Sequence, residues 1–295
     1  MAAQGVASVY VLAILTLLVG LLASIQTVQS AIGVCYGTHG DNLPAPGDVV
    51  QLYQSNHIDA MRIYLPNDTI LHALRGTRIA VVLDAPDVRS LASDDDINTS
   101  SSAAQAWVQA NGQQYYIKYI AVGNEVKGGD KPKILPAMNN IRDALSAAGL
   151  GGHIRVSTAV EMSAFACSPL PSGSAFADPS IMGPIVKFLA SNGSPLLANA
   201  ARVYNQNLIN HVEKGTPKRP VALETYIFTM FDENQKGDAI GKHFGLFNPD
   251  KSPVYSINFS ITSDSGLQSQ PSMGWASRPA FYALQVKDYI QHSSR

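Results

Sequence analysis

The chain has 295 residues, of which 46% are hydrophobic and 15% are charged, and its formal net charge is −1. A charged fraction well below the usual ~25% favours a large buried core over a disordered chain. A near-neutral charge argues against the clustered basic face that phosphate binding requires, so no nucleic-acid partner is predicted.

The first 30 residues differ in composition from the rest of the chain. Val6 to Ala23 is almost uncharged, and the small residues Val28 and Ser30 suit cleavage after Ser30. This pattern is typical of a signal peptide, although no basic residue precedes the apolar run. The run is also just long enough for a membrane anchor, which is the alternative interpretation. We predict a cleaved signal and a secreted protein of the cell wall or apoplast, with no membrane association afterwards and the vacuole as the alternative compartment.

The sequons agree with secretion, and the cysteines show how the secreted fold would be stabilised. A glycoprotein is predicted from four N-x-[ST] sequons, which can be used only in the secretory pathway: Asn67, Asn98, Asn192 and Asn258. The two cysteines that remain after signal removal, Cys35 and Cys167, are too few for a disulfide scaffold. Cys35 lies in an apolar strand and is predicted to be a buried free thiol.

Strand-like and helical segments alternate along the chain. Strands are predicted at residues 32–37, 61–65, 79–85, 117–125, 154–160, 196–199 and 221–231. Helices are predicted at residues 46–56, 69–76, 103–112, 133–150, 179–193 and 201–212, and a loop at 93–102. This alternation predicts βαβ units and a parallel sheet. Because no Gly-x-Gly-x-x-Gly follows the first strand, the pattern favours an α/β fold of the (β/α)₈ TIM-barrel type over a dinucleotide-binding domain.

Polar residues stand at the ends of several predicted strands, where barrel enzymes gather their functional groups. The first strand ends at Tyr36, the second at Tyr64, and the fourth at Asn124 and Glu125. Glycoside hydrolysis needs a carboxylic acid that protonates the leaving oxygen and a carboxylate opposite it. The set therefore suits sugar hydrolysis, although Glu125 alone would also fit a solvent-facing residue at a strand end.

Glu224 lies among Leu223, Tyr226 and Ile227. A buried acid seldom lacks a partner, so Glu224 belongs either to a site or to a structural ion pair. Asp94 to Asp96 lack the spacing of a calcium loop, and the histidines show no zinc-binding spacing. There is also no Gly-x-Ser-x-Gly motif for a serine hydrolase. No metal and no cofactor are predicted.

Five long stretches carry a specific resemblance: IGVCYG…NLP, GDVVQLYQSN…MRIY, IKYIAVGNEVKGG…ILPAMNNI, ALSAAGLG…IRVSTA and YNQNLINHV…LETYIFTMFDENQK…FGLFNPDKSPVYSINF. They resemble glycoside hydrolase family 17, the plant glucan endo-1,3-β-glucosidases. The resemblance implies a (β/α)₈ barrel that hydrolyses β-1,3-glucans with retention. A monomer is predicted, with plant defence or development as its possible roles. The resemblance makes Glu125, in the Gly-Asn-Glu motif, the general acid/base. The substrate-binding residues predicted around it are Tyr36, Tyr64, Asn124, Glu224, Glu233 and Lys236.

The chain departs from this family after residue 199. Between Asn199 and Val221 there is room for one helix and no strand, and the resemblance identifies that helix as helix seven. Helix six and strand seven are therefore predicted to be missing between Asn199 and Arg202. In the family, strand seven ends in Ser-Glu-Ser-Gly-Trp-Pro, whose Glu is the nucleophile, and no such motif occurs in this chain.

Three segments are predicted: a signal peptide at residues 1–30, an incomplete barrel domain at 31–259, and a non-family tail at 260–295 that is weakly helical over 281–290. By family, the chain is predicted to be a glycosidase, an endohydrolase of (1→3)-β-D-glucosidic linkages in β-glucans. The missing nucleophile predicts inefficient hydrolysis. The alternatives are a non-catalytic β-glucan-binding or defence-associated protein, and a misassembled gene product that does not fold stably.

Overall fold

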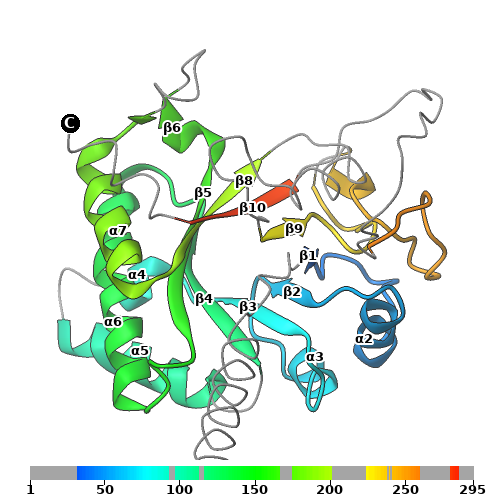
Figure 1. The fold of residues 1–295 in the computed structure, drawn as a ribbon, viewed down its shortest axis with the longest axis horizontal. Coiled ribbons are helices and arrows are strands. Elements are labelled where there is room, and N and C mark those ends of the chain that lie inside the picture. The colour runs from blue at the N-terminus through cyan, green and yellow to red at the C-terminus, as the bar shows by residue number, and fades with distance from the viewer. Residues whose placement is uncertain are drawn as a thin grey trace, which may run out of the picture.

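A closed barrel organises the chain (Figure 1). In this computed structural model, the described residues are 32–92, 97–112, 116–166, 175–200, 224–237, 239, 241–259 and 280–285. For residues 97, 98, 162, 199, 200 and 280–285 the description covers the backbone alone. The predicted signal peptide, Cys167, Asp94 to Asp96 and the predicted helix at 201–212 lie outside these ranges.

Eight strands form the barrel, in the order β1-β2-β3-β4-β5-β8-β10-β9. Their bounds are β1 Ile32–Tyr36, β2 Ala60–Ile63, β3 Ala80–Asp84, β4 Ile117–Asn124, β5 Arg155–Glu161, β8 Pro195–Ala200, β9 Thr225–Ile227 and β10 Ala280–Gln285. All neighbouring pairs are parallel except the two that involve β10, which is antiparallel to both β8 and β9. The barrel is thus one parallel strand short of a (β/α)₈ barrel, as the incomplete fold predicted from the sequence requires.

Helices pack around the outside of the strands (Figure 1). They are α2 Pro46–Ser55, α3 Asp68–Ala73, α4 Val88–Leu91, α5 Ile97–Asn111, α6 Ile134–Ala147 and α7 Pro179–Asn192, with 3₁₀ turns at η1 Gly128–Lys133, η2 Met162–Ala164 and η4 Gly241–His243. A two-stranded ribbon, β6 Phe165–Ala166 and β7 Ala175–Phe176, follows β5. Among the described residues, no helix combines the length and the apolar character needed to cross a membrane.

Local sequence accounts for where several helices begin and end. Pro46 starts α2, a position where its missing N–H costs no hydrogen bond. The side chain of Asn67 accepts hydrogen bonds from Thr69 N and Ile70 N and so caps α3. Gly193, with φ of 62°, ends α7 in the left-handed conformation that glycine adopts without strain.

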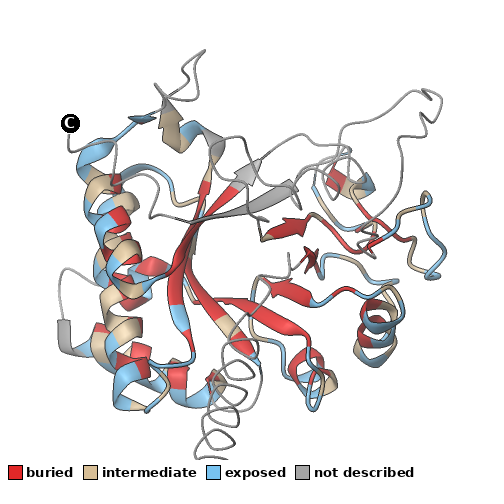
Figure 2. Cartoon of the chain, viewed as in Figure 1, coloured by how far each residue is buried: buried red, intermediate tan, exposed pale blue. Residues whose placement is uncertain are grey.

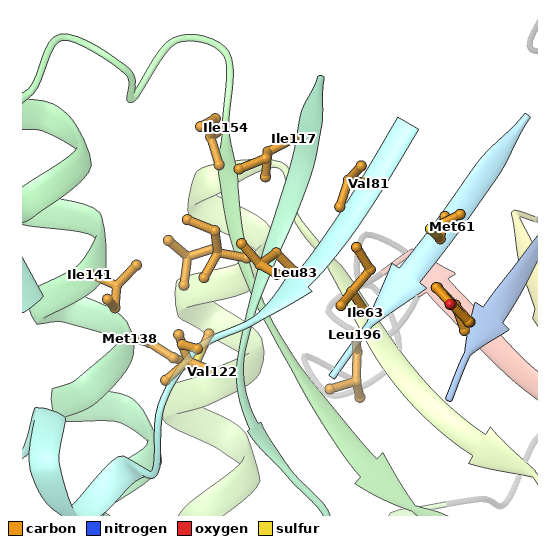
Figure 3. Packing of buried hydrophobic residues seen from close by; sticks show 14 of the residues in the cluster. Met61, Ile63, Val81, Leu83, Ile117, Val122, Met138, Ile141, Ile154 and Leu196 are labelled. Atoms are coloured by element: carbon orange, nitrogen blue, oxygen red, sulfur yellow. The ribbon is translucent and has the colours of Figure 1, made fainter. Parts of the chain in front are cut away.

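The larger core lies between the strands and the helices. Most described residues of the parallel strands are buried, whereas the helices expose their outer faces (Figure 2). Figure 3 shows Met138 and Ile141 of α6 facing Val122 of β4, and all three side chains are fully buried. This layer holds the branched and long apolar side chains of the strands, which explains why the strands appear in the sequence as apolar runs.

A second cluster fills the inside of the barrel and combines small side chains with two tyrosines: Cys35, Ala60, Ala80, Val82, Tyr119, Ala121, Ala159, Leu197 and Tyr226. Because side chains alternate along a strand, each of the parallel strands supplies one set to this interior and the other to the helical layer. Gly33 shows how tightly the interior is filled, since a Cβ there would lie 2.4 Å from the Tyr226 ring. The barrel is a packed core, not a pore.

The prediction of a buried free thiol at Cys35 is confirmed. Burial raises the pKa of this thiol to about 11, against a smaller lowering by the Arg62 charge. Only about one Cys35 in a thousand should then be a thiolate at pH 8, and the thiolate is the reactive form. We expect Cys35 to resist iodoacetamide at pH 8 in the folded protein and to react once the protein is unfolded, as measured by mass spectrometry of the Cys35 peptide. Rapid labelling without unfolding would contradict this burial.

Two predicted elements differ in extent. Within the described part of the strand expected over 221–231, β9 covers Thr225–Ile227, and it ends there because Thr229 N donates to Phe244 O and so leaves the sheet. The loop expected over 93–102 ends early, since α5 begins at Ile97.

The helical tendency predicted over 281–290 was wrong for residues 281–285, and residues 286–290 lie outside the described ranges. Residues 280–285 are strand β10 and not helix. Their partners on β8 and β9 supply ladder hydrogen bonds that an isolated helical turn lacks.

Candidate active site

The carboxyl ends of the parallel strands form one mouth of the barrel. Glu125 directly follows β4, and its backbone is left-handed, with φ of 53°. Gly123, with φ of 78°, lets the chain turn there, and Glu125 N donates to Ala159 O at 2.9 Å. A non-glycine residue in this conformation is strained and persists only where its surroundings hold it. The Gly-Asn-Glu sequence therefore presents Glu125, which is half-buried, in a fixed position at the mouth.

A buried ion pair supports the neighbouring Asn124. Arg62 Nε and Nη2 donate to the two carboxylate oxygens of Asp84 at 3.0 and 2.8 Å, and Nη2 also donates to Asn124 Oδ1 at 3.2 Å. The side chains of Arg62 and Asp84 are 0% and 6% exposed. Burial raises the pKa of the Asp84 carboxyl above its ordinary value, and the Arg62 charge opposes this rise. The guanidinium also lies 4.6 Å from the centre of the Tyr64 ring.

Glu233 and Lys236 form a second ion pair at the mouth. Glu233 is 1% exposed, its Oε1 accepts a hydrogen bond from His39 N at 2.9 Å, and its Oε2 contacts Lys236 Nζ at 2.5 Å. A Cβ at position 37 would lie 2.3 Å from Glu233 Oε1, so only glycine fits there. The turn after β1 and the turn that carries Glu233 are thereby locked together.

Aromatic rings connect the two ion pairs. Lys236 Nζ lies 4.2 Å from the centre of the Phe228 ring. Phe228 in turn meets Tyr64 edge to face at 6.2 Å and Phe244 at 6.1 Å. Phe228 and Tyr64 are half-buried, so part of each ring faces the mouth. Such rings can act as apolar platforms for sugar rings.

A pocket adjoins Glu125. Its lining comes from the ends of β4 and β5, from η1 and η2, and from the first turns of α6 and α7, and it includes Lys131, Glu161 and Asp178. Glu161 lies 3.7 Å from Lys127 Nζ, and a hydrogen bond from Ser163 lowers its pKa. The pocket is therefore lined by three carboxylates, those of Glu125, Glu161 and Asp178, and by the cation of Lys131, at the exit of β4 and β5.

The structure brings together four of the predicted substrate-binding residues, Tyr64, Asn124, Glu233 and Lys236, in the mouth that carries Glu125. Tyr36 is not among them. It is 3% exposed, packs edge to face on Phe231 at 6.3 Å, and burial raises its pKa to about 12. Its place in β1 alternates with Cys35, which faces the barrel interior, so Tyr36 faces the helical layer.

Glu224 is not at the mouth either. It precedes β9, next to the start of β4, where its Oε2 accepts from Lys118 Nζ at 2.8 Å and its Oε1 accepts from Tyr226 Oη at 2.9 Å. Glu125 lies seven residue steps after Lys118, roughly 23 Å along the direction of β4. Of the two interpretations left open by the sequence, the structural ion pair fits this position.

The sequence interpretation missed Arg62, Asp84 and Phe228. A signal was present for the first two, because each interrupts an otherwise apolar strand on its inward-facing side. A buried Arg and a buried Asp on neighbouring strands need each other. No groups of three or more metal-ligating side chains occur in the part of the chain that the structure describes.

Asp84, Glu161 and Glu233 are further carboxylates at this end of the barrel, and each already has a cationic partner. In a (β/α)₈ barrel, the place between β8 and β9 would hold a parallel strand whose carboxyl end points to the mouth. Here the place holds β10, which runs the other way. Its sequence, AFYALQ, contains no Asp or Glu.

Comparison with known proteins gives consistent matches. The family model of Glycosyl hydrolases family 17 matches residues 32–202 and again 198–259. A glucan endo-1,3-β-glucosidase, acidic isoform, of Zea mays is 43% identical, over 88% of this chain and 100% of that protein. A glucan endo-1,3-β-glucosidase GII of Hordeum vulgare is 40% identical with the same coverage, and Lichenase-2 of Hordeum vulgare is 36% identical over 78% of this chain.

Solved structures agree. One of two plant β-glucan endohydrolases with distinct substrate specificities matches with a TM-score of 0.71 and 34% identity, covering 77% of this chain and 100% of that one. CJP38, a β-1,3-glucanase and allergen of Cryptomeria japonica pollen, matches with a TM-score of 0.72 and 34% identity, covering 79% and 100%. Because the family model and the relatives match most of its length, and because Glu125 stands at the barrel mouth, this chain belongs to glycosyl hydrolase family 17.

Proposed function

We propose that this chain is an endo-1,3-β-glucanase by descent, that it binds β-1,3-glucan at the barrel mouth, and that it no longer hydrolyses the glucan efficiently. The glucan class comes from the relatives, most of which are glucan endo-1,3-β-glucosidases. The observation that carries the loss of hydrolysis is β10, because the strand beside the mouth brings no carboxylate opposite Glu125.

Retaining hydrolysis explains why this absence matters. Glu125 is the general acid that protonates the glycosidic oxygen as the bond to the anomeric carbon breaks. A second carboxylate, about 5–5.5 Å away, must attack that carbon and form a glycosyl-enzyme, which water then hydrolyses with Glu125 as the base. Without the second carboxylate, no side chain attacks the anomeric carbon as positive charge develops on the sugar ring, and no glycosyl-enzyme forms.

A missing internal segment accounts for the missing carboxylate. The family match breaks into two parts that meet at residues 198–202. The alignment with the maize protein runs over 346 positions, which exceeds the 295 residues of this chain, so it contains positions where this chain has no residue. We place the missing helix six and strand seven between Asn199 and Arg202, where the family pattern loses its nucleophile motif.

Glucan binding is tested by affinity electrophoresis in gels with and without laminarin. We expect laminarin to retard the protein, and Tyr64→Ala to weaken binding about two- to tenfold, because a ring that offers an apolar platform contributes about 0.5–1.5 kcal/mol. Tyr116→Ala is the matched control: Tyr116 is 61% exposed but precedes β4, at the other end of the barrel. Unchanged mobility in laminarin, or equal effects of the two variants, would count against a glucan site at the mouth.

We further propose secretion as a monomeric glycoprotein after removal of residues 1–30. The support is the apolar leader and the sequons, of which Asn67 and Asn258 are exposed. N-terminal sequencing of the protein recovered from the medium should begin at Ala31. A cell-associated protein that keeps its leader would instead support the membrane-anchor interpretation.

A further inference from the structure

Two strand edges face each other across one position of the barrel. One edge of β8 pairs in parallel with β5, and one edge of β9 pairs in parallel with β1. The other edges of β8 and β9 face each other. Between them lies the place of the missing parallel strand. If it were vacant, the backbone N–H and C=O groups of both edges would lack partners beside an apolar core, and such edges promote aggregation.

Residues 280–285 occupy this place (Figure 1, β10). All six have register partners on β8, from Ala280 opposite Ala200 to Gln285 opposite Pro195. Three of them also pair with β9 and so cover its full length, from Thr225 to Ile227. The fit is therefore continuous along β8 and complete along β9.

The sequence of the tail suits this role. AFYALQ contains two aromatic residues and no Gly, Pro or charge, as expected of a strand paired on both sides. It is joined to the barrel domain at Phe259, which is buried in the outer core. The 20 residues from 260 to 279 could extend over roughly 66 Å, more than the ~30 Å diameter of a small domain. Chain length therefore does not prevent the tail from reaching the place between β8 and β9 of its own barrel.

We propose that residues 280–285 are a built-in complementing strand, and that the place between β8 and β9 is a binding site for one extended antiparallel strand. The occupant is the chain's own tail. A barrel that lost a parallel strand is thereby closed by backbone pairing from outside the family domain. The tail at 260–295 is then required for a closed barrel, independently of whether the mouth binds glucan.

The pairing is tested by disulfide trapping in the full-length protein. Ala198 and Tyr282 are register partners, whose Cα atoms should lie about 4.5–5.5 Å apart, within reach of a disulfide. We expect Ala198→Cys/Tyr282→Cys to form an intramolecular cross-link on mild oxidation, seen as a faster-moving monomer on a non-reducing gel. The control is Val160→Cys/Tyr282→Cys. Val160 is the partner of Ala198 on β5, so it lies two strands from β10, roughly 10 Å away and too far to bridge.

At least tenfold more intramolecular cross-link in the first pair than in the control would support the proposal. Equal amounts in both pairs would overturn it. A covalent dimer would also overturn it, because the place between β8 and β9 would then hold the tail of a second copy.

A second pair of variants needs no cysteines. Phe281 has a register partner on each side, Asn199 and Tyr226, so its N–H faces a neighbouring strand in either orientation. Phe281→Pro should therefore lower Tm by several degrees, whereas Gln268→Pro, outside the strand, should leave it unchanged. Equal Tm values for the two variants would contradict a structural role for β10.

Discussion

Replacing Arg62 with Met is expected to lower the free energy of unfolding by about 3–5 kcal/mol, the range observed when one partner of a buried ion pair is removed. The change leaves the Asp84 carboxylate inside the barrel without the two hydrogen bonds that it accepts from Arg62. The cost is the burial of an uncompensated charge. Midpoints of denaturant unfolding, followed by tryptophan fluorescence, measure it.

An exposed ion pair provides the control. Arg89 and Asp87 form a similarly bidentate pair, in which Nε donates to Oδ1 and Nη2 to Oδ2, but their side chains are 65% and 50% exposed. Arg89→Met should change the free energy of unfolding by less than about 1 kcal/mol, because water screens exposed pairs. The double variant Arg62→Met/Asp84→Leu should recover much of the loss, since no isolated charge remains. If Arg62→Met lowered the free energy of unfolding as little as Arg89→Met does, the Arg62–Asp84 pair would not stabilise the barrel mouth as described.

The sequence predicted the regular part of this fold well, because apolar runs of strand length are a strong signal. Six of the seven predicted strands correspond to barrel strands with small shifts at their ends, and the seventh contracts to Thr225–Ile227. The tail strand could not be predicted. Residues 280–285 have a weak local pattern, and their conformation depends on two strand edges far away in the sequence.

The candidate site was predicted in part, for reasons that lie in strand geometry. Glu233 and Lys236 share a motif and a turn, and the structure pairs them. Tyr36 was predicted to bind substrate because it stands at a strand end. Side chains alternate along β1, however, and that of Tyr36 points toward the helices. Glu224 was predicted to bind substrate because it belongs to the predicted last strand. It stands before β9, however, and therefore at the end of the barrel opposite the mouth. Motif matching finds which strand carries a residue, whereas parity and direction decide where the side chain points.

Hydrolysis of laminarin should be lost. In enzymes whose catalytic groups act as a unit, removal of the nucleophile alone lowers the rate by several orders of magnitude, on the order of 10⁴-fold or more. The acid Glu125 cannot compensate, because protonation of the leaving oxygen and attack on the anomeric carbon occur on opposite sides of the sugar. Glu161, beside Glu125 in the pocket, adjoins Lys127 and belongs to β5, not to the strand between β8 and β9.

The most direct test is the release of reducing ends from laminarin by the purified protein and by its Glu125→Gln variant, with the 43%-identical maize glucanase as positive control. We predict equal, background-level rates for the chain and its variant, at least about 10⁴-fold below the maize enzyme. Release that is well above background and disappears in Glu125→Gln would contradict the proposal, because it would show that this barrel has a working nucleophile.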